Sequence, residues 1–262
     1  MLKRVVITGA SGTVGRELSR LLESAGTEVI GWDRRRVPVN NYAAMEDFLE
    51  ETRPQVLFHL ATASRPTGLP NEDWLVNFEW ASELAWITRH QGIRFVFTSS
   101  VLVFSSRARG PFTLESEPDA MEGYGFQKRM AEQRVMYQNP EAVVVRLGWQ
   151  IGRFPGSNNM VDFLHRQMER EGRIEASQKW LPACSFLEDT VQVLAGMWKY
   201  PAGLYMVDSN RGWNFYQIAQ ALNHRFGQPW KVVPGNSLDQ DQRMIDPRVE
   251  IPPLSEKLSQ LG

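Results

Sequence analysis

A tyrosine and a lysine four positions apart, Tyr124 and Lys128, are the residues of this sequence best suited to acid–base chemistry. Within a helix, residues at this spacing project from one face. An unperturbed phenol has a pKa of about 10 and is a poor acid–base catalyst at neutral pH. An ammonium about 4 Å away, at an effective dielectric of about 20, stabilises phenolate by up to roughly 4 kcal/mol, or about three pKa units. We therefore expect Lys128 to bring the phenol of Tyr124 into a useful range.

A serine, Ser100, ends the apolar run that precedes this pair in the chain. A hydroxyl at this place can form a hydrogen bond to the substrate carbonyl oxygen that Tyr124 protonates. The adjacent Ser99 is the competing candidate, but alternation along a strand directs its side chain to the opposite face. The predicted catalytic residues are therefore Ser100, Tyr124 and Lys128.

Three glycines, Gly9, Gly12 and Gly15, follow the apolar run Val5–Ile7 at equal intervals. Between a strand and a helix, the first glycine permits a tight turn and the second lets the backbone approach a diphosphate. The third lets the helix pack closely on the strand. The diphosphate would lie on the N–H groups at the start of the helix. The alternative is a tight turn that binds nothing.

An acidic residue, Asp33, lies 18 residues beyond Gly15 at the end of the next predicted strand. Its carboxylate can accept hydrogen bonds from an adenosine ribose, which favours NAD. However, Arg34, Arg35 and Arg36 follow at once, and guanidinium groups suit the 2′-phosphate of NADP. A loop of solvated charges is the other interpretation of these arginines. Both NAD and NADP are therefore predicted cofactors.

These residues need a scaffold in which apolar strands alternate with amphipathic helices. The pattern predicts strands at 5–7, 28–32, 55–61, 94–100 and 142–147, and helices at 14–22, 42–52, 72–90 and 123–138. Strands that are apolar throughout and separated by helices indicate a parallel sheet covered on both faces. The predicted fold class is α/β, a Rossmann-type doubly wound parallel sheet with ligands at the carboxyl ends of its strands.

The character of the chain changes after Gly148. The segment 149–159 is loop-like, and it is followed by helices near 160–171, 186–200 and 214–226 and a short strand at 203–207. We expect residues 1–148 to form the NAD(P)-binding domain. Residues 149–262 are expected to form a smaller C-terminal substrate-binding lobe, interleaved with the first domain.

The composition is that of an ordinary globular protein of 262 residues with a net charge of −1, so no global field favours nucleic acid or a membrane surface. No apolar run approaches the roughly 20 residues needed to cross a bilayer, and no signal peptide is apparent. The single cysteine, Cys184, excludes an intrachain disulfide, and the four histidines lie too far apart in sequence to suggest a metal site. A cytoplasmic protein without metal, nucleic-acid or membrane partners is predicted.

Taken together, the glycine spacing, the strand-end serine and the Tyr-x-x-x-Lys pair resemble the extended short-chain dehydrogenase/reductase superfamily, which acts largely on nucleotide sugars. Within this NAD-dependent epimerase/dehydratase superfamily, the chain is most similar to the dTDP-4-dehydrorhamnose reductase family, from residue 1 to about residue 250. The segments that carry the resemblance are Arg53-PQVLFHLATAS, Phe97-TSSVLVF, Tyr124-GFQKRMAE, Val145-RLGWQIG and Gly203-LYMVDSNRGWNFYQIAQAL.

The resemblance implies an NAD(P)-dependent oxidoreductase acting at a keto or hydroxyl carbon of a nucleotide-activated sugar, in a chain that can form a homodimer. It also implies that Trp149 lies near the sugar and that Asn77 supports the active site. Arg243 is a candidate ligand of a substrate phosphate, or else a solvated charge. Ser100, Trp149 and Arg243 are thus the expected substrate-binding residues. The expected cofactor-binding residues are Gly9, Ser11, Gly12, Thr13, Val14, Gly15, Asp33, Arg34, Leu60, Ala61, Thr62, Asn77, Tyr124 and Lys128.

The sequence departs from the reductase family directly after the catalytic serine. Val101 and Leu102 stand where the family has an acidic residue and a tyrosine, and residues 64–73 do not reproduce its acidic substrate loop. The missing acid argues against a dehydratase. An epimerase with the same triad is one alternative. The other is a non-catalytic nucleotide-binding subunit, like the regulatory partner of methionine adenosyltransferase.

Overall fold

The computed structural model describes residues 2–64, 67–153 and 158–261. Residues 65–66 of the predicted substrate loop and 154–157 of the predicted loop after residue 149 lie outside the described residues. The chain forms two compact units, and each combines segments from both sides of residue 148. The first unit comprises Met1–Ser105, Pro118–Arg146 and Val191–Tyr205, and the second comprises Ser106–Glu117, Leu147–Thr190 and Met206–Gly262.

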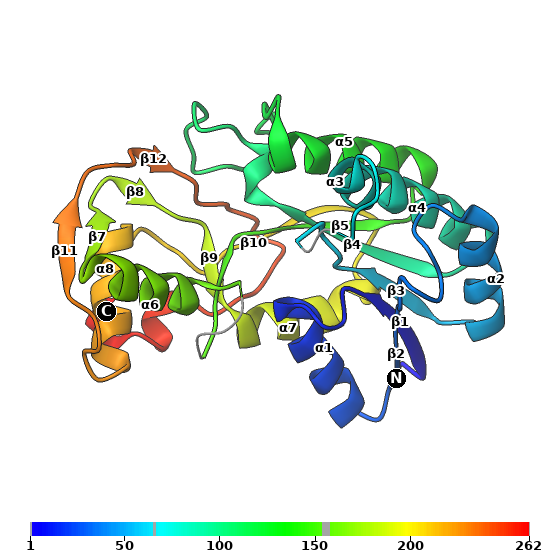
Figure 1. The fold of residues 1–262 in the computed structure, drawn as a ribbon, viewed down its shortest axis with the longest axis horizontal. Coiled ribbons are helices and arrows are strands. Elements are labelled where there is room, and N and C mark those ends of the chain that lie inside the picture. The colour runs from blue at the N-terminus through cyan, green and yellow to red at the C-terminus, as the bar shows by residue number, and fades with distance from the viewer. Residues whose placement is uncertain (1, 65–66, 154–157, 262) are drawn as a thin grey trace. The chain divides into compact units, whose positions relative to one another are not determined.

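A six-stranded sheet of order β10-β5-β4-β3-β1-β2 lies mainly in the first unit (Figure 1). Its strands are β1 (Arg4–Thr8), β2 (Glu28–Gly31), β3 (Val56–His59), β4 (Arg94–Ser100), β5 (Val143–Leu147) and β10 (Gly203–Val207). Neighbours run parallel, as in the pairing of β1 with both β2 and β3. The predicted α/β class with a doubly wound parallel sheet is confirmed. The short strand predicted at 203–207 joins this sheet as its edge strand.

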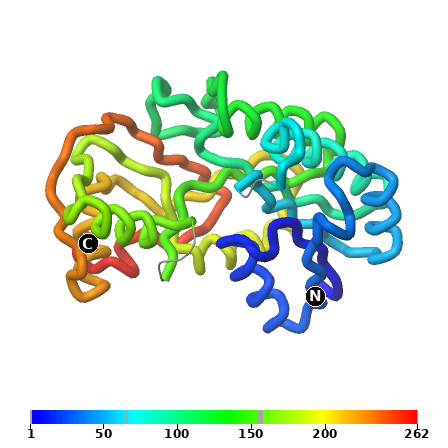
Figure 2. The backbone as a smooth tube through the Cα atoms, in the orientation of Figure 1, coloured from blue at the N-terminus to red at the C-terminus, as the bar shows by residue number. Residues whose placement is uncertain are grey.

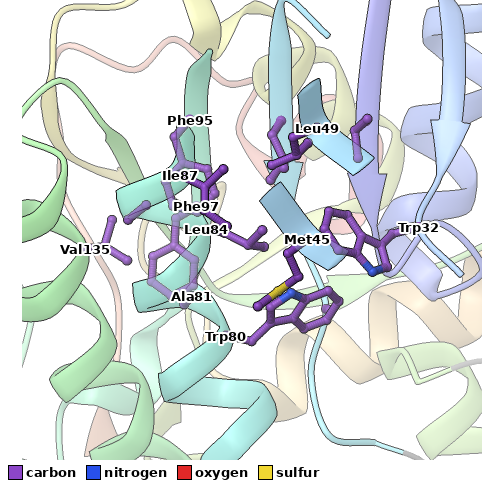
Figure 3. Packing of buried hydrophobic residues seen from close by; sticks show 14 of the residues in the cluster. Trp32, Met45, Leu49, Trp80, Ala81, Leu84, Ile87, Phe95, Phe97 and Val135 are labelled. Carbon is purple, nitrogen blue, oxygen red and sulfur yellow. The ribbon is translucent and has the colours of Figure 1, made fainter. Parts of the chain in front are cut away.

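The helices of the first unit cover both faces of the sheet. Their bounds are α1 (Thr13–Ser24), α2 (Tyr42–Thr52), α4 (Trp80–His90), α5 (Gly123–Gln138) and α7 (Leu187–Gly196), which straddles the unit boundary and is followed by the 3₁₀ turn η3 (Met197–Lys199). One large core joins α2, α4 and α5 to the sheet, with Trp32, Trp80 and Phe97 among its members (Figure 3). The tube of Figure 2 shows α1 on the side of the sheet opposite α4 and α5. The apolar strands are therefore buried from both sides, as their composition predicts.

The helix predicted at 72–90 is interrupted. The structure has α3 (Glu72–Trp74), a π-helical turn η1 (Leu75–Glu79) and then α4. A π-turn inserts one extra residue into a helix and is frequent at functional sites. The predicted extent of the helix is confirmed, but periodicity over 19 residues does not reveal the one inserted residue of the π-turn. Asn77 lies in this turn.

The second unit contains three two-stranded parallel ladders, which pair β6 with β9, β7 with β11 and β8 with β12. Its elements are β6 (Trp149–Ile151), α6 (Met160–Glu171), β7 (Ile174–Ser177), β8 (Trp180–Leu181), β9 (Cys184–Phe186), α8 (Phe215–Arg225), β11 (Val232–Gly235), β12 (Gln240–Asp241), η4 (Leu254–Glu256) and η5 (Ser259–Leu261). The loop predicted from residue 149 onward is therefore wrong over Trp149–Ile151, which pairs with a strand more than 30 residues away. Such long-range pairing leaves no local pattern.

The segment Ser106–Glu117 belongs to the second unit although it precedes α5 in the chain. Its backbone is bonded to a distant segment: the N–H of Gly110 donates to the carbonyl of Asp241 at 2.9 Å, and that of Phe112 to the carbonyl of Arg243 at 2.7 Å. Within the described ranges, no helix is long and apolar enough to span a membrane. The same residues contain no histidine, cysteine or carboxylate cluster that could hold a metal ion.

Candidate active site

The end of β4 and the start of α5 meet through backbone contacts. After Ser100 the chain forms the 3₁₀ turn η2 (Val101–Val103), and the Ser100 hydroxyl oxygen accepts a hydrogen bond from the Leu102 N–H at 3.1 Å. Gly125, on the first turn of α5, packs so closely on this turn that a Cβ there would overlap the carbonyl oxygen of Leu102. Ser100 and the neighbouring Tyr124 are therefore held on adjoining backbone segments.

Lys128 occupies the same face of α5, one turn after Tyr124. Its side chain is 1% exposed, and its Nζ donates a hydrogen bond of 2.9 Å to the carbonyl oxygen of Thr98 on β4. The ammonium lies 4.4 Å from the ring centroid of Phe97 and 5.9 Å from that of Tyr124. Burial lowers the pKa of Lys128 to about 7, although the carboxylate of Glu132 opposes this shift. Lys128 thus titrates near neutrality.

The phenol of Tyr124 behaves differently from the sequence-based expectation. Burial raises the pKa of Tyr124 above its ordinary value. The expectation considered only the attraction of the ammonium and left out desolvation, which penalises a buried phenolate. In the structure the phenol of Tyr124 is therefore held in its neutral, protonated form. A reaction that consumes a proton fits this form better than one that requires a standing phenolate.

The two serines at the end of β4 face different surroundings. Ser99 is buried, and its hydroxyl has no hydrogen-bond partner among the described residues, whereas Ser100 is partly exposed. Burial does not alternate along β4, so the exposure of Ser100 is what distinguishes the two serines. The structure favours Ser100 over Ser99 as the group that meets a substrate.

A chain of side-chain hydrogen bonds joins the π-turn to α5. The Asn77 Nδ2 donates to Gln127 Oε1 at 2.8 Å, and the Gln127 Nε2 donates to Asp73 Oδ2 at 3.0 Å. The Asn77 Oδ1 in turn accepts from the N–H of Ala63, after β3, at 3.1 Å. Asn77 therefore fixes the loop after β3 relative to the catalytic helix. Gln127 was not singled out from the sequence, and no local pattern points to it.

The glycine turn after β1 has the shape required for a diphosphate. Gly9 has a φ of +69°, and a Cβ there would lie 3.0 Å from the N and Cα atoms of Ala61. A Cβ on Gly15 would overlap the carbonyl oxygen of Gly9. Gly12 is the N-cap of α1 and has no side chain with which to cap it, so the first N–H groups of α1, from Thr13 and Val14, remain available to an anion. The residues present therefore fit a dinucleotide cofactor, and Ser11 lies in the same turn.

The charged residues after β2 are already paired. The Oδ1 of Asp33 accepts from the backbone N–H of Arg35 at 2.9 Å, and the bonds from Arg35 hold the pKa of Asp33 below its ordinary value. Arg34 forms an ion pair of 3.3 Å with the buried carboxylate of Glu72. Asp33 therefore stays ionised for a ribose, and Arg34 is oriented by its partner. The carboxylate predicted to bind the ribose of NAD and the guanidinium predicted to bind the 2′-phosphate of NADP are therefore both present.

A threonine organises the ends of β1 and β3. The Thr8 hydroxyl accepts hydrogen bonds from the N–H groups of Leu60 at 3.1 Å and Ala61 at 3.2 Å. Its remaining proton therefore goes to His59 Nδ1, 2.8 Å away, which places the ring proton of a neutral His59 on Nε2. Burial, with the nearby charge of Lys128, holds the pKa of His59 well below its ordinary value. The backbone of Leu60 and Ala61, which lies against Gly9 of the glycine turn, is therefore held in place by Thr8 and continues into Thr62.

This neutral histidine predicts a dependence of stability on pH. The folded chain keeps His59 unprotonated, whereas the unfolded chain binds a proton with a pKa of about 6.5. Because the unfolded state then binds more protons, stability falls as pH drops below about 6.5, by up to about 1.4 kcal/mol per pH unit until the folded pKa is reached. Urea unfolding from pH 7.5 to 5 should show a shallower decline for His59→Gln than for wild type. The exposed His165→Gln variant should decline like wild type, and equal slopes for all three proteins would contradict the assignment.

The predicted substrate residues Trp149 and Arg243 lie in the second unit. The Trp149 ring stacks on Trp180 at a centroid distance of 5.9 Å, and Phe215 packs at the same distance. The guanidinium of Arg243 pairs with Asp241 at 2.6 Å and is partly buried. Trp149 therefore belongs to an aromatic cluster, and Arg243 is held in one direction by its own carboxylate partner.

A buried ion pair behind Lys128 was not predicted. The Arg146 Nε and Nη2 donate to Glu132 Oε1 and Oε2 at 2.9 and 2.7 Å, and both side chains are 3% exposed. Arg146, on β5, thus binds the Glu132 carboxylate in a bidentate manner. The spacing of Glu132, four residues after Lys128, was the available signal.

Comparisons with known proteins identify the family. The model of the family described as "RmlD substrate binding domain" matches residues 3–243. A dTDP-4-dehydrorhamnose reductase of Streptomyces griseus is 26% identical over 95% of this chain and 84% of its own length. Methionine adenosyltransferase 2 subunit beta of Xenopus laevis is 24% identical over 87% of this chain and 73% of its own.

Solved structures show the same fold. The dTDP-4-dehydrorhamnose reductase of Bacillus anthracis, in complex with NADP, superposes with a TM-score of 0.83 at 20% identity, over 99% of this chain and 97% of that one. Bordetella bronchiseptica WbmH, in complex with NAD+, gives a TM-score of 0.79 at 18% identity, over 99% and 97% of the two chains. Because the family model covers nearly the whole sequence, the resemblance stated from the motifs is confirmed. The chain belongs to the RmlD substrate-binding domain family, within the extended short-chain dehydrogenase/reductases.

Proposed function

We propose that this chain reduces a keto carbon of a nucleotide-activated sugar with NADH or NADPH. Two relatives are named dTDP-4-keto-6-deoxy-D-glucose reductase and dTDP-4-dehydrorhamnose reductase, and one reductase structure of this fold is in complex with NADP. The observation that carries the proposal is the arrangement at the end of β4. There Tyr124 and Lys128 share one face of α5, and Gly125 packs that helix on the turn that follows Ser100. The predicted class, an NAD(P)-dependent oxidoreductase, is confirmed by the family and its relatives.

The proton chemistry belongs to Tyr124 and Ser100. Tyr124 is neutral because burial raises its pKa, so it can give a proton to the oxygen of the keto group. Ser100 is partly exposed beside it, and its hydroxyl orients and polarises that oxygen. When bound, the reduced nicotinamide supplies the hydride, and the protein contributes alignment and charge.

Lys128 and the glycine turn carry the rest of the proposed site. The Thr98 carbonyl takes one Lys128 N–H, and the others can bond a cofactor ribose and stabilise the phenolate that forms after proton transfer. Gly9, Gly12 and Gly15 give the diphosphate access to the N-terminus of α1. Asp33 and Arg34 are the proposed contacts of the adenosine ribose and its 2′ position. Trp149 and Arg243 are the proposed contacts of the sugar nucleotide.

The proposal is tested by following NAD(P)H oxidation with a panel of 4-keto nucleotide sugars. We expect turnover with at least one of them, with the cofactor bound in the absence of sugar. Tight cofactor binding without turnover of any keto sugar would overturn the reductase proposal. That outcome would favour the non-catalytic subunit, and one relative of this chain is named methionine adenosyltransferase 2 subunit beta.

An epimerase gives a third, distinct outcome. It would return a stereoisomer of the sugar with no net change in NAD(P)H. A dehydratase is disfavoured, because the residues after Ser100 are Val101, which is buried, and Leu102, which is 46% exposed, and neither can act as an acid. We further propose a cytoplasmic homodimer. Trp86 on α4 and Tyr137 on α5, both exposed, offer apolar surface for such contacts.

A further inference from the structure

The buried pair of Glu132 and Arg146 is not explained well by stability. Removing two charges from water costs several kcal/mol per ion, and apolar replacements of such pairs are often neutral or stabilising. The Arg146 Nη1 atom is also buried and has no hydrogen-bond partner among the described residues. The pair is thus costly to bury and incompletely hydrogen bonded. Because Glu132 lies on the same helix as Tyr124 and Lys128, the pair is a candidate for a role in the proposed active site.

The pair lies one helical turn beyond Lys128. Tyr124, Lys128 and Glu132 follow at intervals of four residues and therefore share one face of α5. Arg146, on β5, takes both oxygens of the Glu132 carboxylate. Lys128 keeps its own bond to the Thr98 carbonyl, so the carboxylate acts on the ammonium through its charge.

Other ionisable groups near α5 do not supply this charge. On the elements packed against α5 these groups are His59 (β3), Glu72 and Asp73 (α3), Glu79 (η1), Glu83, Arg89 and His90 (α4), Arg94 (β4) and Arg146 (β5). Glu72 is paired with Arg34. Asp73 is bonded to Gln127, and the charges of Glu79 and Arg134 act on Glu83. His59 is neutral, as shown above. Glu132 is the carboxylate whose charge raises the pKa of Lys128.

We propose that Glu132, fixed by its two hydrogen bonds from Arg146, is a positioning residue that holds Lys128 in its ammonium form beside Tyr124. Its negative charge offsets part of the cost of burying the ammonium, and without it Lys128 would be neutral over more of the physiological pH range. The catalytic consequence rests on the proposed function. The charge state of Lys128 does not, because it can be measured without turnover.

The direct test is a pH titration of Lys128 by NMR in protein carrying ¹³C-labelled lysine, with the resonance assigned by loss in Lys128→Met. Wild type should titrate near pH 7, where burial places the pKa of Lys128. In Glu132→Gln the midpoint should fall by about one pH unit, the size of effect that a nearby charge has on a buried group. Glu132→Asp keeps the charge and should titrate within about 0.3 units of wild type.

The same variants should change the pH profile of the reductase. The alkaline limb of kcat/KM, where Lys128 loses its proton, should move to lower pH in Glu132→Gln and return in Glu132→Asp. The double variant Glu132→Gln/Arg146→Met leaves no unpaired buried charge. It should recover stability relative to Glu132→Gln, while Lys128 titrates between the single variant and wild type.

An unchanged Lys128 midpoint in both Glu132→Gln and the double variant would overturn the proposal and leave the pair with a structural role. If Glu132→Gln does not fold, the Lys128 midpoint of the double variant provides the test, because both of its replaced side chains are uncharged. A shifted midpoint in a protein that turns over no keto sugar would support this inference and count against the reductase proposal alone.

Discussion

Replacing Tyr124 with phenylalanine is expected to lower kcat for keto-sugar reduction by about 10²- to 10⁴-fold, the usual contribution of a positioned general acid. The variant removes the hydroxyl that donates the proton and leaves the ring in place. In the described part of the chain no group is hydrogen bonded to this phenol, so its loss leaves no buried partner unsatisfied. The free energy of unfolding and the dissociation constant of NAD(P)H should therefore stay close to wild type. Steady-state kinetics, urea unfolding and fluorescence titration of the cofactor measure the three quantities.

Tyr137→Phe is the matched control for this variant. Tyr137 lies on the last turn of the same helix and is 74% exposed. The same chemical change there should leave kcat unaltered. If Tyr124→Phe kept more than about a tenth of wild-type kcat, another group would have to be the proton donor, since a loss of tenfold or less is below the range of general acid catalysis.

Replacing Gly125 with alanine is expected to damage both stability and catalysis. The added Cβ would overlap the Leu102 carbonyl oxygen, and backbone atoms cannot move aside as a flexible side chain can. Overpacking of this kind costs about 1–3 kcal/mol, occasionally more. Any relief requires α5 to move away from the turn after Ser100, and a misplacement of about 1 Å can cost about 10²-fold in rate. We therefore expect a lower free energy of unfolding together with a lower kcat.

The control for Gly125→Ala is Gly196→Ala. Gly196 ends α7, and a Cβ there would meet no atom within 4 Å. This variant should keep the stability and kcat of wild type. A Gly125→Ala protein with wild-type kcat would mean that the contact with Leu102 does not set the distance between the catalytic groups.

The positions of the three proposed catalytic residues could be predicted from the sequence because each lies on a regular element. Tyr124 and Lys128 are four residues apart on one helix, and Ser100 is the last residue of an apolar strand. The spacing along each element therefore determines the direction of these side chains. The glycine turn is equally local. It depends on three glycines at positions where a Cβ would crowd neighbouring backbone atoms.

Features that depend on distant segments could not be predicted in this way. The strand at Trp149 exists because of its pairing with Cys184–Phe186, and Ser106–Glu117 packs with segments more than a hundred residues later in the chain. The elevated pKa of Tyr124 depends on burial, which spacing does not report. The π-turn at Asn77 adds a single residue to an otherwise helical pattern.

The contact between Gly125 and Leu102 has a consequence for how this protein could acquire new substrates. Tyr124 and Ser100, the proposed proton donor and its partner, adjoin two backbone segments so close that a Cβ on Gly125 would overlap the Leu102 carbonyl oxygen. Trp149 and Arg243, the proposed contacts of the sugar nucleotide, belong to the other compact unit. A mutant library confined to that unit should therefore change substrate preference while the rate of proton transfer is retained. Evolvability and catalytic fidelity would then reside in separate parts of the same chain.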